Sequence, residues 1–358
     1  MNGLRIAVIG AGHLGSIHAR LLKSVEGVDL VGVVDPVRES RERVANECGT
    51  DAFEHCDQLR AEISAAVVAT PTRCHFEIAD RLLRRGVHVL VEKPITASVA
   101  EADRLIAAAR RHRRVLQVGH VERFNPAWNA VAPRVSGPRY IEAVRAGTYT
   151  FRSTDVSIVH DLMIHDLDLV LALADSPVVD VEAMGVNVFG PHADLAHAQL
   201  KLANGCIVNL NASRVSYQPQ RTMRVFSPRA CATIDFARNQ ATLVHPREDV
   251  LRRAVDLTAC PTAQRRQIQD TLFQDLLRVE NVEVEPINAI LQQQREFVAS
   301  ILHGRPVRVT GQQGRNALAV AEQIQQSIRS HRWNGTAEGP VGPDAAGELA
   351  RVAPSRAA

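Results

Sequence analysis

The chain has 358 residues, of which 46% are hydrophobic and 23% charged, so it has the composition of a soluble globular protein with room for two domains. A net charge of only +3 argues against a nucleic-acid partner, and no apolar run is long enough for membrane insertion. The N-terminus shows no signal-peptide pattern, and the six cysteines show no C-x-x-C spacing. We therefore expect a cytoplasmic protein with free thiols and no metal site.

The first fifteen residues have the pattern of a dinucleotide-binding turn. An apolar run at residues 6–9 predicts a buried parallel strand, and the glycine-rich turn at residues 10–15 (GAGHLG) leads into residues with helical spacing. In such a turn Gly10 permits the tight bend, Gly12 lets a pyrophosphate approach the backbone, and Gly15 lets helix and strand pack closely. Backbone N–H groups at the start of the helix then face the phosphates. We expect cofactor contacts at Gly10, Gly12, His13, Leu14 and Gly15.

A second predicted strand, at residues 28–34, ends at Asp35, about twenty residues after the last glycine. A carboxylate at this place binds the ribose hydroxyls of the cofactor and repels a 2′-phosphate, so NAD is expected rather than NADP. Arg38 lies nearby and weakens that preference. A glycine turn that binds no nucleotide is the alternative.

Strands and helices continue to alternate as far as residue 119. Strands are expected at residues 66–70, 87–91 and 115–119, and helices after Pro71 and after Ser98. The alternation predicts an α/β Rossmann domain over residues 1–122, with the cofactor lying across the strand ends. Further cofactor contacts are therefore expected at Thr70, Pro71, His75, Glu92 and Lys93, although His75 is equally compatible with a helix-surface histidine.

Lys93 is one of only three lysines in the chain, and it follows the apolar strand that ends in Glu92. Lysine, unlike arginine, can release a proton near neutral pH when its surroundings lower its pKa. One interpretation is a catalytic amine that contacts a substrate hydroxyl at the strand end. The other is a strand-end lysine paired with Glu92.

Residues 123–333 show a different pattern. Short β-type runs occupy residues 140–150 and 178–244, turn signals separate them, and only one long helix, at residues 159–174, interrupts them. Two late helices are expected at residues 287–302 and 316–331. These runs predict an α+β domain over residues 123–333 with a large, mostly antiparallel sheet. The alternative for one late helix is that it packs back on the first domain. Residues 334–358 are rich in Gly, Pro and Ala and predict a disordered tail.

The helix expected at residues 159–174 carries Asp161, His165 and Asp168 at a spacing that places them on one face. Such polar groups on a largely apolar helix need partners. They form either an internal Asp–His pair or a general base, His165, oriented by a carboxylate. A zinc site is a third possibility, but it is disfavoured because no Cys or second His falls at the spacing of zinc ligands.

Taken together, the glycine turn, the Glu92-Lys93-Pro94 tripeptide and the Asp161-x-x-x-His165-x-x-Asp168 helix resemble the Gfo/Idh/MocA family over residues 1 to about 331. The resemblance implies a Rossmann domain followed by an open sheet that commonly forms a dimer or tetramer interface. It also implies oxidation of a sugar or cyclitol hydroxyl with a nicotinamide cofactor. By the same resemblance, Lys93 hydrogen-bonds the reacting hydroxyl, His165 is the acid/base, and Asp161 orients His165 or the substrate.

Residues 119–126 (GHVERFNP) are similar to the branch of this family that oxidises the 3-hydroxyl of UDP-N-acetylglucosamine ahead of an aminotransferase of lipid A biosynthesis. Arg123, with Arg152 and Tyr217, is a candidate contact for the diphosphate or the base. Alternatives are a dehydrogenase of the corresponding uronate, an inositol or free-sugar dehydrogenase and a non-catalytic NAD-dependent sensor. The enzyme hypothesis requires that Lys93 and His165 reach one sugar hydroxyl.

Overall fold

The computed structural model describes residues 3–59, 62–151, 156–189, 191–258 and 260–331. Arg152 and the tail predicted at residues 334–358 lie outside these residues. The chain divides into two compact units, each of which is described by itself. Unit 1 comprises Met1–Phe124 and Ile287–Ala319, and unit 2 comprises Asn125–Pro286 and Val320–Ala358. Residues 287–319, which the sequence places in the second domain or in a late helix returning to the first, thus belong to unit 1.

Unit 1 contains a six-stranded sheet in the order β3-β2-β1-β4-β5-β6, and every strand pair in it is parallel. Its strands are β1 (Leu4–Ile9), β2 (Val28–Val34), β3 (Ala52–Phe53), β4 (Ala65–Val68), β5 (His88–Glu92) and β6 (Leu116–Gly119). The direction of winding reverses between β1 and β4, and open parallel sheets bind their ligands at the carboxyl ends of strands beside such a reversal. The predicted Rossmann fold is confirmed.

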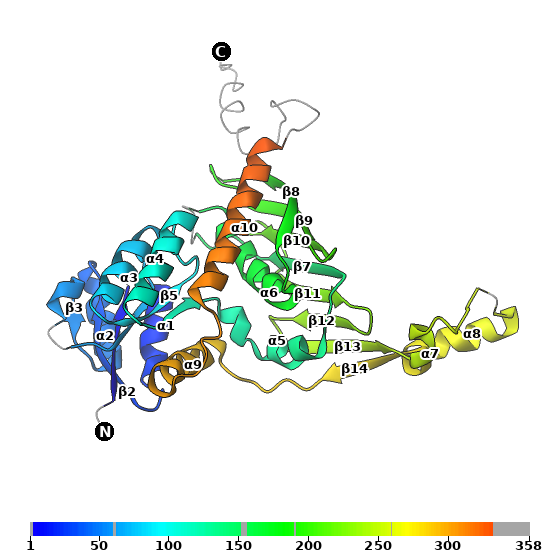
Figure 1. The fold of residues 1–358 in the computed structure, drawn as a ribbon, viewed down its shortest axis with the longest axis horizontal. Coiled ribbons are helices and arrows are strands. Elements are labelled where there is room, and N and C mark those ends of the chain that lie inside the picture. The colour runs from blue at the N-terminus through cyan, green and yellow to red at the C-terminus, as the bar shows by residue number, and fades with distance from the viewer. Residues whose placement is uncertain (1–2, 60–61, 152–155, 190, 259, 332–358) are drawn as a thin grey trace, which may run out of the picture. The chain divides into compact units, whose positions relative to one another are not determined.

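Helices cover both faces of this sheet (Figure 1). Alternate residues of β1 point to opposite faces, so Ala7 and Ile9 join the core beneath α3 and α4, whereas Ile6 and Val8 join the core beneath α1, α2 and α9. Phe297 on α9 is fully buried in that second core. The helices are α1 (His13–Leu22), α2 (Arg38–Cys48), α3 (His75–Arg84), α4 (Val99–Arg111) and α9 (Ala289–His303).

Unit 2 is built on an eight-stranded sheet in the order β14-β13-β12-β11-β7-β10-β9-β8, in which only β7 and β10 pair in parallel. The mostly antiparallel sheet predicted from the sequence is therefore confirmed. Its strands are β7 (Tyr140–Ala146), β8 (Val178–Val186), β9 (Leu195–Leu202), β10 (Ile207–Ser213), β11 (Gln220–Phe226), β12 (Cys231–Asp235), β13 (Gln240–Pro246) and β14 (Leu277–Val282).

Three elements near the end of this sheet have no counterpart in the sequence prediction: β14 and the helices α7 (Glu248–Leu251) and α8 (Thr262–Thr271). The residues of α8 are not buried, and β14 has no buried residue either. The sequence predictions depend on apolar residues that recur with the period of a helix or strand, and segments that bury nothing give no such signal.

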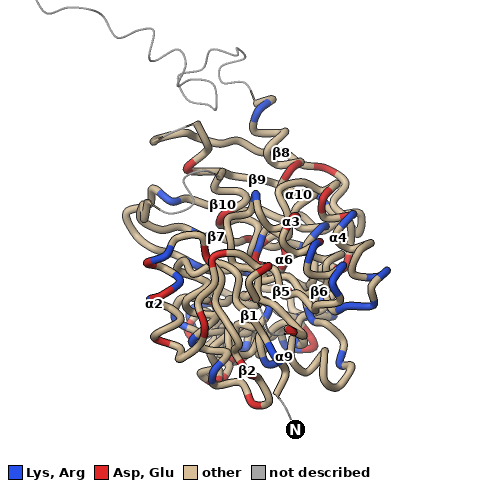
Figure 2. Tube along the Cα trace, turned by 90° about the vertical axis from the view of Figure 1, so that its left-hand side faces the viewer, with Lys and Arg blue, Asp and Glu red and all other residues tan. Residues whose placement is uncertain are grey.

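One face of the sheet is covered by α5 (Pro126–Val131), α6 (Ile164–Ala174) and the second half of α10 (Gly311–Ser330). Leu167 on α6 and Ile324 on α10 pack with strand residues such as Ile141 and Leu210 in one core. Lys and Arg residues are interspersed with Asp and Glu residues along the described trace, in agreement with the small net charge (Figure 2).

A buried ion pair fastens α6 to the middle of the sheet. Arg145 on β7 donates from Nη2 to Asp166 Oδ1 over 2.8 Å and from Nε to Asp166 Oδ2 over 3.1 Å. Both side chains are only 4% exposed, so neither charge is hydrated by bulk water and each depends on the other.

Replacing Arg145 by Met is expected to lower the free energy of unfolding by about 3–5 kcal/mol, because the carboxylate of Asp166 is left buried without this partner. The Arg145→Met/Asp166→Leu double variant should lose less than either single variant. The control is Arg224→Met, which breaks the exposed pair with Glu142 on neighbouring strands and should cost less than about 1 kcal/mol. Denaturant titrations measure the free energy of unfolding of each variant. A loss in the double variant equal to the sum of the losses in the two single variants would contradict this account.

Candidate functional site

The glycine turn has the geometry that the sequence predicts for a pyrophosphate site. Gly10 has φ +100°, and a Cβ on it would lie 2.5 Å from the carbonyl oxygen of Ala69. A Cβ on Gly15 would lie 1.8 Å from the carbonyl oxygen of Gly10, so α1 packs directly on the turn. Gly12 is the N-cap of α1, and a Cβ on it would meet no other described atom within 4 Å. Space is therefore left in front of the backbone at the start of the helix, where anions bind.

Asp35 lies directly after β2, as predicted, and it holds the glycine turn. Its Oδ2 accepts the N–H of Ala11 over 2.7 Å, and its Oδ1 accepts the N–H of Val37 over 2.8 Å. Each carboxylate oxygen has a further lone pair available for a ribose hydroxyl. Arg38 donates to Glu42 one turn along α2, in an exposed pair.

His75 joins the loops that follow β4 and β5. Its Nε2 lies 2.8 Å from the carbonyl oxygen of Thr70, and its Nδ1 lies 2.8 Å from that of Pro94. His75 is the first residue of α3 and is only 1% exposed, so the alternative of a helix-surface histidine is wrong. Burial lowers the pKa of His75, against the two carbonyl hydrogen bonds that raise it. A neutral imidazole has one N–H and donates to one of these carbonyls at a time.

Glu92, the last residue of β5, is buried beside the backbone of Lys93. Its Oε1 lies 2.8 Å from Nε2 of His18, and its Oε2 accepts the N–H of Lys93 over 3.3 Å. Burial by itself raises the pKa of this carboxyl, but the hydrogen bond of His18, the charge of Lys93 and the backbone N–H of Lys93 bring it below its ordinary value. The Lys93–Pro94 peptide bond is cis. Lys93 itself is half-buried at the carboxyl end of the strand.

Arg123 lies in the 3₁₀ turn Val121–Phe124, which follows β6. Its Nη2 donates to the carbonyl oxygen of Arg308 over 3.3 Å, and Arg308 in turn donates to the carbonyl oxygen of Arg123 and to Glu296. The predicted substrate contact at Arg123 therefore involves a side chain that also ties β6 to the segment after α9. Tyr217, another candidate, is 92% exposed.

In unit 2, the helix expected at residues 159–174 consists of two parts. Val159–Met163 form a π turn, in which the N–H of Ile164 bonds to the carbonyl oxygen of Val159, and α6 begins at Ile164. The sequence predicts one regular α-helix over residues 159–174. That prediction is wrong for the first turn, which is a π turn and holds more residues than a turn of α-helix. Asp161 lies in the π turn and His165 in the first turn of α6, both half-buried, whereas Asp168 is buried. Such turns are frequent at functional sites.

The segment that leads into the π turn is anchored by a second buried ion pair. Asp194 accepts from Nε of Arg214 over 2.6 Å and from the N–H groups of Val188 and Phe189. Arg214 also donates to the carbonyl oxygen of Val156. Burial raises the pKa of Asp194, but the backbone N–H groups and Arg214 lower it below its ordinary range.

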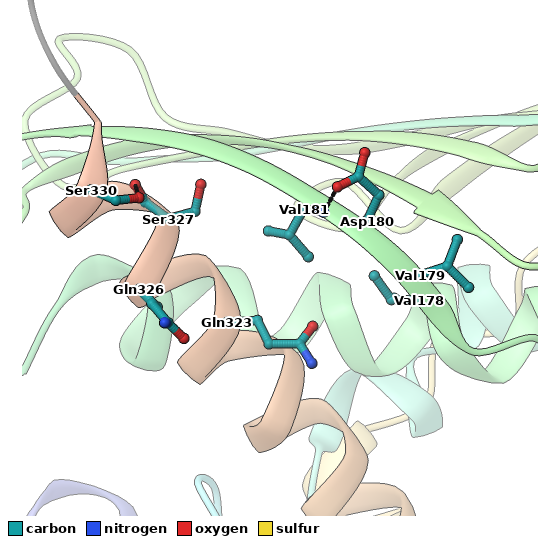
Figure 3. A pocket seen from close by; sticks show the side chains of 8 residues that line it. All are labelled: Val178, Val179, Asp180, Val181, Gln323, Gln326, Ser327 and Ser330. Atoms are coloured by element: carbon teal, nitrogen blue, oxygen red, sulfur yellow. Dashed lines mark hydrogen bonds between the residues drawn. The ribbon is translucent and has the colours of Figure 1, made fainter.

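A pocket in unit 2 lies between β8 and the end of α10 (Figure 3). Valines and Asp180 from the strand face glutamines and serines from the helix, and Asp180 Oδ1 accepts the N–H of Val181. Among the described residues of its lining, Asp180 is the one titratable side chain, so these residues offer no pair of groups for proton transfer. The residues predicted to act are not part of it.

Comparisons with known proteins identify the family. Residues 4–120 match the model of an oxidoreductase family with an NAD-binding Rossmann fold, and residues 131–232 match the Gfo/Idh/MocA C-terminal domain. The chain is 37% identical over 328 residues to UDP-N-acetylglucosamine 3-dehydrogenase of Acidithiobacillus ferrooxidans, a match that spans 91% of this chain and 98% of that one.

The chain belongs to the Gfo/Idh/MocA oxidoreductase family. A solved structure of the Acidithiobacillus enzyme superposes with a TM-score of 0.80 at 36% identity, covering 92% of this chain and 99% of that one. The scyllo-inositol 2-dehydrogenase (NAD(+)) of Bacillus subtilis is 28% identical over 232 residues, which span 60% of this chain and 68% of that one. The resemblance seen in the sequence motifs is thus confirmed, and the protein is an NAD-dependent oxidoreductase.

The residues of unit 1 fit the cofactor of a Gfo/Idh/MocA enzyme. The open space at Gly12 and the N-terminus of α1 suit the pyrophosphate, and Asp35 suits a ribose. In the part of the chain that the structure describes, no group of three or more His, Cys, Asp or Glu side chains is arranged to hold a metal ion. Over the same residues, no helix combines the length and the apolar character that a membrane crossing requires. All six cysteines are free thiols.

Sequence reasoning missed the residues that hold these candidates in place: His18, Gln294, Arg145, Asp166, Asp194 and Arg214. His18 could have been found, because it lies three residues after Gly15 and four before Leu22, on the stripe of α1 that faces the core. The partners of the others come from distant parts of the chain and leave no local pattern.

Two glycines of the turn make a matched test of this site. Gly15→Ala should lower the free energy of unfolding by about 3 kcal/mol or more, since its Cβ has no room beside Gly10. Gly12→Ala should change that free energy by less than about 0.5 kcal/mol, yet weaken NAD binding about tenfold by filling the space meant for a phosphate. Calorimetric titration with NAD and thermal unfolding distinguish the two effects. Unimpaired NAD binding by Gly12→Ala would contradict the assignment.

Proposed function

We propose that this Gfo/Idh/MocA protein oxidises the 3-hydroxyl of UDP-N-acetylglucosamine to the 3-keto sugar. The observation that carries the proposal is the 37% identity to a UDP-N-acetylglucosamine 3-dehydrogenase over 98% of that enzyme. Identity of this extent includes both units and the segments in which Lys93, Arg123 and His165 lie. When bound, NAD supplies the hydride acceptor.

The role proposed for Lys93 is to hold the reacting hydroxyl and to stabilise its oxygen as negative charge develops. A cation placed where charge develops in the transition state is among the strongest catalytic effects. Lys93 is suited to it because β5 ends there and the backbone on both sides is held, by Glu92 and by the contact of Pro94 with His75. We propose that Glu92, Thr70, Pro71 and His75 shape the adjoining cofactor pocket.

The role proposed for His165 is to take the hydroxyl proton, with Asp161 orienting the imidazole or the sugar. Imidazole has an ordinary pKa near neutrality, which suits a general base. The Arg145–Asp166 pair fixes the first turn of α6, on which His165 lies. Arg123 is proposed as a contact for the diphosphate of the substrate.

The direct test is to incubate the protein with UDP-N-acetylglucosamine and NAD or NADP, and to follow reduced cofactor and keto sugar. NAD should be preferred, because Asp35 repels a 2′-phosphate. Lys93→Met and His165→Asn should each lower kcat by about two to four powers of ten. Lys93→Arg should also be impaired, since the larger planar guanidinium does not replace a compact ammonium at the reacting hydroxyl. The controls are Lys23→Met, at the end of α1, and His303→Asn, in the last turn of α9.

The Lys93→Met/His165→Asn double variant tests whether both side chains serve one step. Groups that act together on one hydroxyl give strongly non-additive losses, so the double variant should be little worse than the poorer single variant. Full activity of Lys93→Arg, or absence of keto sugar with the unaltered protein, would overturn the proposal.

A second candidate function is oxidation of a cyclitol or free sugar, favoured by the identity to the scyllo-inositol dehydrogenase. A substrate panel distinguishes the two functions. Activity on inositols with none on UDP-sugars would establish the cyclitol dehydrogenase. Tight NAD binding with no turnover on any sugar would instead establish a non-catalytic sensor.

We further propose a homodimer or homotetramer formed through the face of the eight-stranded sheet that α5, α6 and α10 leave uncovered. Cross-strand hydrogen bonds connect the polar side chains there, His197 with Asn211 and Gln199 with Asn209. Such a ladder gives a flat, ordered polar surface, and identical surfaces pair readily about a two-fold axis.

Asn209→Arg places a charge in the middle of that face, where a two-fold axis would bring it near its own copy. The dissociation constant of the oligomer should rise by about two powers of ten or more, because like charges oppose association. Light scattering over a range of concentrations measures it, with Gln312→Arg on α10 in unit 1 as the control. A mass that stays that of the unaltered oligomer would contradict this interface.

The remaining context is also a proposal. A 3-keto sugar is a substrate for transamination, so we propose that an aminotransferase consumes the product, as in the formation of lipid A precursors. We propose a cytoplasmic location, which six free thiols support because oxidising compartments favour disulfides.

A further inference from the structure

The carboxylate of Glu92 is buried where the chain passes from β5 into Lys93. The residue is 7% exposed, and Gly119 on β6 lies so close that a Cβ there would be 2.7 Å from the carboxyl group. A buried carboxylate without partners is strongly unfavourable. Its contacts therefore decide where this strand end, and the lysine after it, can lie.

The contact on one side runs through His18 to Gln294, from α1 to α9. Nε2 of Gln294 lies 3.0 Å from the carbonyl oxygen of His18 and 2.9 Å from Nδ1 of the same residue. A carbonyl oxygen can only accept, so the Gln294 atom is the amide NH₂ group, and Nδ1 of His18 must accept as well. The proton of a neutral imidazole is then on Nε2, which donates to Oε1 of Glu92 over 2.8 Å.

The contact on the other side runs to the chain itself. Oε2 of Glu92 accepts the N–H of Lys93, and one residue further the carbonyl oxygen of Pro94 lies 2.8 Å from Nδ1 of His75. The backbone that carries the lysine is thus fastened on both sides of that residue.

We propose that His18 is a positioning residue for the amine of Lys93: set in one tautomer by Gln294, it orients the Glu92 carboxylate, which in turn holds the backbone N–H of Lys93. This inference rests on the proposed function, in which Lys93 contacts the reacting hydroxyl. A misplacement of about 1 Å at a reacting group can cost about 100-fold in rate, so a residue that never touches the substrate can still control turnover.

The ionised form of Glu92 is the one that accepts both hydrogen bonds. The titratable groups that face it are His18 on α1, Lys93 next in the chain and His75 at the start of α3. With His18 in place the pKa of Glu92 is lowered, so the carboxylate and the geometry it holds are lost only as the pH falls through that low value. Without the His18 hydrogen bond, burial raises the pKa, and the loss moves to higher pH.

The test compares two substitutions of His18 in the full-length protein with NAD and UDP-N-acetylglucosamine. His18→Leu keeps the volume and removes both hydrogen bonds, and it should lower kcat about 10- to 100-fold and move the acid limb of the pH profile upward by about one unit or more. His18→Gln keeps a donor for Glu92 and an acceptor for Gln294, and it should restore kcat to within about threefold. Loss of packing alone would not move the acid limb.

The matched control is His88→Leu, at the amino end of the same strand. His88 accepts the N–H of Val115 and lies at the opposite end of β5 from the tripeptide, so its loss should leave kcat and the acid limb unchanged. Wild-type kcat and an unmoved acid limb in His18→Leu would overturn the proposal, as would a loss in His18→Gln equal to that in His18→Leu.

A measurement without substrate separates this inference from the proposed function. In protein labelled with ¹⁵N-histidine, the resonances absent from His18→Gln belong to His18, and they should show the neutral Nε2–H tautomer. Gln294→Leu should allow the other tautomer or a charged ring. A charged His18 or an Nδ1–H tautomer in the unaltered protein would refute the relay even in an active enzyme. If the tautomer is as expected and no sugar is oxidised, the proposed function fails while the relay stands.

Discussion

A buried carboxylate at the end of a parallel strand is the constraint on which the candidate site of unit 1 depends. Glu92 lies between the backbone of Lys93 and the imidazole of His18, with Gly119 closing the space beside it. Because this carboxylate is largely buried, the position of the strand end depends on hydrogen bonds to α1 and, through Gln294, to α9. A segment from late in the chain thereby takes part in holding Lys93, the lysine that we propose contacts the reacting hydroxyl.

Unit 2 also contains two buried carboxylates that are each held by an arginine. Arg145 and Asp166 join the middle of the sheet to the first turn of α6, and Asp194 and Arg214 join the segment before the π turn to the strands beside it. Buried pairs of this kind add little stability over apolar packing, yet they break down if one member is removed. They therefore specify where a helix lies, which is what the acid/base role proposed for His165 at the start of α6 requires.

The glycines of the turn at residues 10–15 differ in what requires them. Gly10 and Gly15 are required by the fold itself, since any side chain would collide with the backbone, whereas Gly12 has open space in front of it. Asp35 holds the turn through the N–H of Ala11, and its remaining lone pairs suit the ribose contact that we propose for it.

The sequence by itself determined the Rossmann unit, the mostly antiparallel sheet, the glycine turn with Asp35, and the family to which Lys93 and His165 point. These follow from local rules: the periods of strand and helix, the freedom of glycine, and residues at fixed short spacing. Only the tertiary structure decided that residues 159–163 form a π turn, that α8 and β14 exist although they bury nothing, and that His75 is buried. It alone brought Gln294 to His18, 276 residues away, because contacts between distant segments arise from packing of whole elements and leave no periodic trace in the chain.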